Sequence, residues 1–108
     1  MSQQDDRIVS TLADDPEMAD IVELFTDELP KRIESLESAY QSRAWDTLRT
    51  LAHQLKGAAP SYGFESIGVA AALVENLVKS DPVAEQISDE IEELISLCRR
   101  AAPGGGNG

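Results

Sequence analysis

The sequence predicts an all-α fold, an antiparallel up-down four-helix bundle, and three observations carry that prediction. Apolar residues recur at steps of three and four in four separate segments, which is the spacing of amphipathic helices. No segment alternates apolar and polar residues over more than a few positions, so strands are not expected. The connections between the four segments are short, which favours helices packed as antiparallel neighbours.

The first helical segment runs from Met18 to Tyr40, and its apolar spacing continues through Pro30. Because proline removes a backbone donor and crowds the preceding turn, we expect one long helix with a kink near Pro30. Two helices with a tight break there are the alternative. Asp15 followed by Pro16 has the pattern of an N-cap and a first helical residue, which predicts a helix start at Pro16.

The other three segments follow the same spacing. The second carries Trp45, Leu48, Leu51, Ala52 and Leu55; the third carries Ile67, Ala70, Ala71, Val74, Leu77 and Val78; the fourth carries Val83, Ile87, Ile91, Leu94, Ile95 and Cys98. Pro60 disfavours helical geometry at Ala59 and is expected to shorten the second helix. Pro82 follows an aspartate and predicts the start of the fourth helix. The apolar stripes also predict that Phe25, Trp45 and Cys98 are core residues.

The chain of 108 residues is one domain by length. We divide it into an N-terminal segment over 1–15, a helical bundle over 16–101 and a glycine-rich tail over 102–108. Ile8 and Leu12 mark a candidate short extra helix in the first segment. The tail is expected to be disordered because it cannot bury apolar surface.

The charge of the chain limits its partners. Twenty acidic residues against nine basic ones give a net charge of -11, which argues against binding to nucleic acid or to an anionic membrane. One cysteine excludes an intrachain disulfide, and one histidine and one cysteine argue against a zinc site. No run approaches the roughly 20 apolar residues of a membrane span, and the acidic N-terminal residues argue against a signal peptide. We therefore expect a cytoplasmic protein.

The only histidine falls on the outer side of the second helix. On a helical wheel His53 lies roughly 140° from the centre of the apolar stripe, so its ring is expected to be exposed. Lys56 is one turn further on the same side, and Gly57, directly below His53, leaves the backbone bare. An exposed imidazole beside an ammonium and a bare backbone suits a large partner that brings an anion. The alternatives are an ordinary surface histidine, a lysine that serves solubility, and Gly57 as a helix C-cap.

These residues resemble a known family. The run from Ala52 to Ala59 contains the pattern His-x-x-Lys-Gly, and it is followed by Tyr62-Gly63-Phe64 and later by Leu73-Val74-Glu75. Together they are similar to a histidine-containing phosphotransfer (HPt) domain, a bundle of four helices that would cover about residues 16–101. Pro60, in the turn after the motif, departs from the family pattern.

The resemblance implies a role for each site residue. HPt domains carry a phosphoryl group between aspartates of receiver domains in multistep phosphorelays and have no catalytic site of their own. His53 would be the phosphoryl acceptor through Nε2, Lys56 would supply charge to the phosphoryl group, and Gly57 would give clearance for docking. Glu75 matches the position that holds Nδ1 of the imidazole. A surface ion pair between Glu75 and Lys79 is an equal alternative.

The same resemblance sets the expected partners and cofactors. Response-regulator receiver domains are the implied partners, with a hybrid sensor kinase as a further one. No cofactor is intrinsic to the chain; the magnesium ion that phosphoryl transfer needs would come with the receiver. No glycine-rich phosphate loop is present, so no ATP-dependent activity is expected.

Two other functions remain open from the sequence. One is the dimerisation and phosphoacceptor part of a sensor kinase, although such parts usually carry an acidic residue where Gln54 stands and form obligate dimers. The other is an inert helical adaptor in which His53 is incidental. For the phosphocarrier we expect a monomer.

Overall fold

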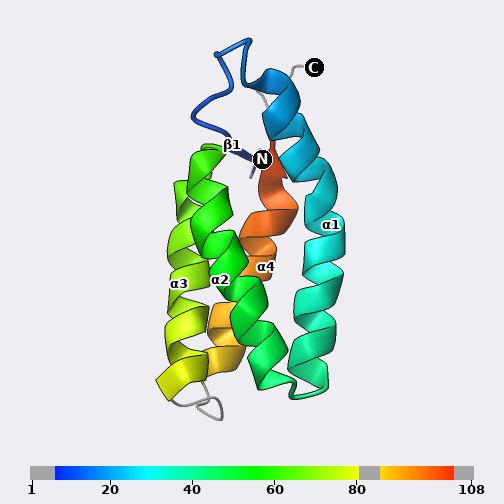
Figure 1. The fold of residues 1–108 in the computed structure, drawn as a ribbon, viewed down its shortest axis with the longest axis vertical. Helices are drawn as coiled ribbons and strands as arrows, with labels where there is room; N and C mark the ends of the chain where they lie inside the picture. The colour runs from blue at the N-terminus through cyan, green and yellow to red at the C-terminus, as the bar shows by residue number, and fades with distance from the viewer. Residues whose placement is uncertain (1–6, 81–85, 104–108) are drawn as a thin grey trace, which may run out of the picture.

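Within residues 7–80 and 86–103, which the computed structural model describes, the chain forms four helices (Figure 1). They are α1 (Ala19–Gln41), α2 (Trp45–Ser61), α3 (Glu65–Ser80) and α4 (Gln86–Arg100). Consecutive helices run in opposite directions, and α1 and α3 each lie beside both α2 and α4. The predicted all-α up-down bundle is confirmed. The start predicted at Pro82 lies outside the described residues.

One apolar core lies between the four helices. Among its fully buried side chains are Val22, Leu29, Leu36, Leu48, Leu55, Ile67, Val74 and Leu94. Phe25 stacks on Tyr62 and Phe64 with ring centroids 4.7 and 5.9 Å apart, and so closes the core at the α2–α3 turn. Cys98 is buried as expected, and this burial raises the pKa of its thiol to about 11. Trp45 is only partly buried, against Tyr40.

Helix α1 passes through Pro30 without interruption, so the alternative of two helices is wrong. The predicted start at Pro16 is also wrong, because α1 begins at Ala19. The Asp15 side chain instead accepts a hydrogen bond from the backbone N–H of Glu17 at 3.0 Å. The aspartate and proline therefore form a turn that precedes the helix.

Pro60 does not shorten α2 as predicted. The helix includes Ala59 and Pro60 and ends at Ser61. A proline this close to the end costs little, because it removes only the bond to the carbonyl of Lys56. The turn that follows is made by Gly63, whose φ is +86°, a conformation that favours glycine. Gly57 lies inside α2, so its interpretation as a C-cap is wrong.

Two short strands join the ends of the described chain. β1 (Ile8–Val9) pairs in parallel with β2 (Ala101–Ala102), with Ile8 opposite Ala101. The expectation of no strands and the candidate helix at Ile8 and Leu12 are therefore wrong. A strand of two residues has no periodicity to detect, and its partner lies about ninety residues away along the chain. Ala102, which we assigned to the tail, belongs to β2, and residues 104–108 lie outside the described part.

Candidate functional site

The imidazole of His53 stands on the outer surface of α2. Its side chain is 66% exposed, while Ala52 and Leu55 on the inner face of the same helix are buried. The helical wheel therefore predicted the direction of this side chain correctly. The apolar stripe of α2 faces the core, and that contact turns the ring outward.

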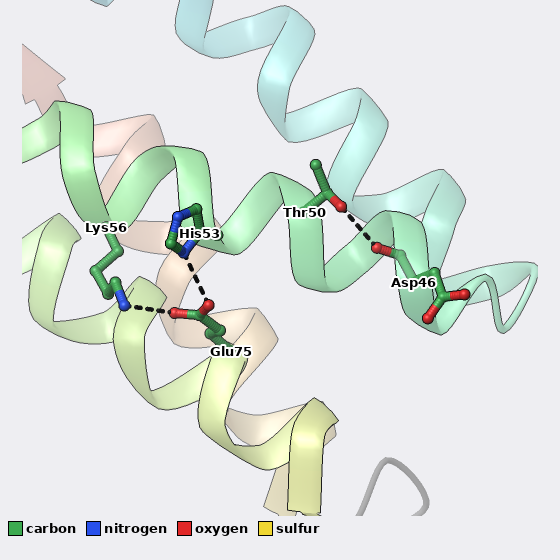
Figure 2. A network of polar contacts seen from close by, with 5 residues as sticks. All are labelled: Asp46, Thr50, His53, Lys56 and Glu75. Atoms are coloured by element: carbon green, nitrogen blue, oxygen red, sulfur yellow. Dashed lines mark hydrogen bonds and ion pairs between the residues drawn. The ribbon is translucent and has the colours of Figure 1, made fainter.

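Glu75 of α3 joins His53 to Lys56 (Figure 2). Its Oε2 atom lies 2.9 Å from Nδ1 of His53, and its Oε1 atom lies 2.8 Å from Nζ of Lys56. The Glu75 side chain is only 6% exposed, whereas that of Lys56 is 43% exposed. We call these three residues the His–Glu–Lys triad. Since both carboxylate oxygens contact α2, the alternative of a surface ion pair with Lys79 is not the arrangement that forms.

The surroundings of Glu75 keep its carboxyl ionised. The hydrogen bond from Lys56 lowers the pKa of Glu75 most, burial opposes this, and the hydrogen bond from His53 lowers the pKa further. An ionised carboxylate can only accept hydrogen bonds, so Nδ1 of His53 is the donor. In a neutral imidazole the lone pair is then on Nε2, which lies on the side of the ring away from Glu75 (Figure 2).

Gly57 leaves open space beside the imidazole. A Cβ atom built on it would meet nothing within 4 Å. No internal clash therefore requires glycine here, and its helix-destabilising effect of about 1 kcal/mol relative to alanine has no packing compensation. The bare backbone is what a partner that approaches His53 along α2 would meet.

The contact between Lys56 and Glu75 was missed by the sequence reasoning. A signal was present, because Glu75 follows Val74 and lies four residues after Ala71, on the apolar side of α3. A charged residue on a buried face requires a partner of opposite charge. That requirement pointed to a lysine on a neighbouring helix.

In residues 7–80 and 86–103 there is no group of three or more His, Cys, Asp or Glu side chains that could hold a metal ion. None of the helices in the same part of the chain is long and apolar enough to cross a membrane.

Comparison with known proteins gives one match. The model of the Hpt domain family matches residues 20–101, which include α1 apart from its first residue, the whole of α2, α3 and α4, and the His–Glu–Lys triad. No curated protein and no solved structure matches the chain. With a match over most of its length, the chain belongs to the Hpt domain family, whose members are phosphoryl carriers in histidine phosphotransfer and interact with receiver domains.

Proposed function

We propose that the chain is a phosphorelay carrier that accepts a phosphoryl group on Nε2 of His53 from a receiver aspartyl phosphate. It then passes the group to an aspartate of another receiver. The observation that carries this proposal is the contact of Glu75 with Nδ1 of a largely exposed imidazole. That contact selects the tautomer in which the outward nitrogen is the nucleophile.

The transfer needs no proton to leave the ring. The Nε2 lone pair of His53 forms a bond to phosphorus while the bond between phosphorus and the aspartyl oxygen breaks. The aspartate leaves as a carboxylate, which is a good leaving group at neutral pH. The Nδ1 proton stays on the ring, which becomes positively charged, and the carboxylate of Glu75 stabilises that charge. The reverse step, with a second aspartate, regenerates the neutral ring.

Lys56 and Gly57 support the transfer in different ways. Lys56 is one turn from His53, and its ammonium neutralises part of the negative charge of the phosphoryl group. Gly57 lets the partner surface reach the imidazole without meeting a side chain. The receiver supplies the magnesium ion that its own carboxylates hold and that phosphoryl transfer requires. The chain acts as a cytoplasmic monomer, with receivers and a hybrid sensor kinase as its partners.

A labelling experiment tests this function. The chain is incubated with a phosphorylated receiver and magnesium, and label that is labile in acid but stable in alkali is measured. We expect such label in the wild type and none in His53→Gln, since the chain has a single histidine. Gln54→Ala is the matched control, because it changes the next residue and leaves the imidazole in place. Persistence of the label in His53→Gln would exclude the assignment.

A further inference from the structure

Helices α2 and α3 come into close contact at Pro60 and Gly68. A Cβ atom on Gly68 would lie 2.6 Å from Cγ and 2.9 Å from Cδ of Pro60. Carbon atoms do not approach this closely without repulsion, since favourable contacts begin at about 3.5 Å. Both Pro60 atoms belong to a ring that closes onto the backbone and so cannot swing away. Any side chain at position 68 must therefore push the two helices apart.

On each of the two helices, the residue in this contact is seven positions away from a triad residue. Pro60 is seven residues after His53, and Gly68 is seven residues before Glu75. Seven residues are about two helical turns, or about 10.5 Å, and they return to nearly the same face of a helix. Because α2 and α3 run antiparallel, the Pro60–Gly68 contact lies two turns from the His53–Glu75 hydrogen bond on the same interface.

Gly68 also meets the backbone of the third triad residue. Its Cβ position lies 3.5 Å from the carbonyl oxygen of Lys56. Pro60 has no N–H to bond that carbonyl in the usual helical pattern, so the carbonyl lies beside Gly68 without that partner. Gly68 thus lies against both Pro60 and Lys56 of α2, and the side chain of Lys56 binds Glu75.

We propose that Gly68 and Pro60 are positioning residues that set the spacing of α2 and α3 at which Glu75 reaches both His53 and Lys56. The triad is sensitive to this spacing, because its two contacts are 2.9 and 2.8 Å long. A separation larger by about 1 Å would take both beyond hydrogen-bond range. The effect of Gly68 and Pro60 on phosphoryl transfer rests on the proposed function of His53. Their effect on the geometry of the triad does not depend on that function.

Nuclear magnetic resonance of the ¹⁵N-labelled full chain tests the proposal, because imidazole nitrogen shifts report which nitrogen carries the proton. The wild type should show the proton on Nδ1. Gly68→Ala should lose that signature and slow single-turnover transfer from a phosphorylated receiver about 10- to 100-fold. Pro60→Ala removes the ring and should weaken the signature. The double variant Pro60→Ala/Gly68→Ala returns a methyl group to the vacated space and should restore both the signature and the transfer.

Gly57→Ala is the control for the nitrogen shifts, because it adds the same methyl group where nothing lies within 4 Å. Its protonation pattern should match the wild type. A folded Gly68→Ala with the wild-type pattern would overturn the proposal. If Gly68→Ala does not fold, the double variant decides: the wild-type pattern supports positioning, whereas an altered pattern or failure to fold contradicts it. A chain that shows the Nδ1 proton but accepts no phosphoryl group would exclude the proposed function and leave the positioning role intact.

Discussion

The imidazole of His53 is held at one nitrogen and open at the other. Glu75 occupies Nδ1 from below, so the ring can react only through the nitrogen that faces outward. The same carboxylate also binds Lys56, which places a neutralised pair rather than a free ammonium beside the ring. In the proposed transfer, an incoming phosphoryl group would therefore compete with Glu75 for Lys56. The position of this one lysine would then decide how much positive charge stabilises the phosphoryl group.

Replacement of Lys56 separates charge from folding. Lys56→Ala should slow single-turnover phosphoryl transfer about tenfold or more, because it removes a charge-assisted hydrogen bond to the phosphoryl group. Lys56→Arg should keep most of the rate, because it keeps the charge. Transfer rates and thermal midpoints of both variants are compared with those of Lys31→Ala, which removes an exposed lysine of α1. A lower midpoint with unchanged transfer in Lys56→Ala would make Lys56 a purely structural residue.

At the scale of single helices, α2 combines a well-packed inner face with a sparse outer one. Its inner residues Leu48, Ala52 and Leu55 are buried, whereas its outer face presents His53 and the bare backbone of Gly57. Glycine at an exposed position of a helix lowers the helix propensity, and here no closer packing compensates for that loss. The outer face of α2 is therefore suited to contact with a partner, and stability does not explain it.

Gly57→Leu tests this view of the outer face. A Cβ atom at position 57 meets nothing within 4 Å, and leucine has a higher helix propensity than glycine, so helicity and thermal midpoint should equal or exceed those of the wild type. Transfer from the receiver should be slowed, because the new side chain blocks the approach to the imidazole. Circular dichroism and single-turnover transfer measure the two effects. Native helicity with wild-type transfer would contradict the clearance role.

The N-terminal segment is bound to the turn between α2 and α3. The hydroxyl of Ser10 donates to the carbonyl of Tyr62 at 2.6 Å, and the N–H of Thr11 donates to the carbonyl of Gly63 at 3.0 Å. A Cβ atom on Gly63 would collide with the side chain of Ser10 and would lie 2.8 Å from the backbone nitrogen of Thr11. This glycine is needed both for its positive φ and for the close approach of the segment.

Two glycine-to-alanine variants should change stability in opposite directions. Gly63→Ala should destabilise the chain by about 1–3 kcal/mol, because alanine is strained at this φ and displaces the N-terminal segment. Gly57→Ala should stabilise it by up to about 1 kcal/mol, because it improves helix propensity where space is open. Urea denaturation of both variants gives the free energies of unfolding. Equal stabilities of the two variants would contradict both the backbone strain of alanine at position 63 and the stabilising contact of the N-terminal segment.

At the scale of the whole molecule, the protonation of Glu75 makes the stability of the bundle depend on pH. The pKa of Glu75 is lowered from its ordinary value of 4.5, first by the hydrogen bond from Lys56. The folded state therefore binds this proton less readily than the unfolded state does. The resulting stabilisation is fully present above about pH 4.5 and is lost as the pH falls through the lower pKa of the folded state.

This linkage predicts a specific response to acid. The difference in free energy of unfolding between the wild type and Glu75→Gln should shrink as the pH is lowered from 6 to 3, because only the wild type loses the ionised carboxylate. Glu93→Gln, which changes an exposed acid of α4, is the control for general charge effects. Urea denaturation over this pH series provides the measurement. A difference that does not change with pH would show that the charge of Glu75 does not stabilise the fold.

The sequence by itself determined the four helices and the direction in which His53 points. Apolar spacing at three and four residues is a local property, and the burial of one face turns the opposite face outward. For this reason the four helices, the exposed imidazole and the open surface at Gly57 could all be predicted. The resemblance to the Hpt family could be seen for a related reason, since its His-x-x-Lys-Gly pattern lies within the single helix α2.

The tertiary structure alone decided the contacts between residues that are far apart in the chain. The pairing of Lys56 with Glu75, the close approach of Gly68 to Pro60, and the β1–β2 pair depend on how separate elements are placed against each other. Local propensity does not encode the distance between two helices, which follows from the side chains that fill the space between them. Pro60 shows the difference: its local preference predicted a shortened helix, whereas the packed chain keeps it within α2, where its ring lies against Gly68.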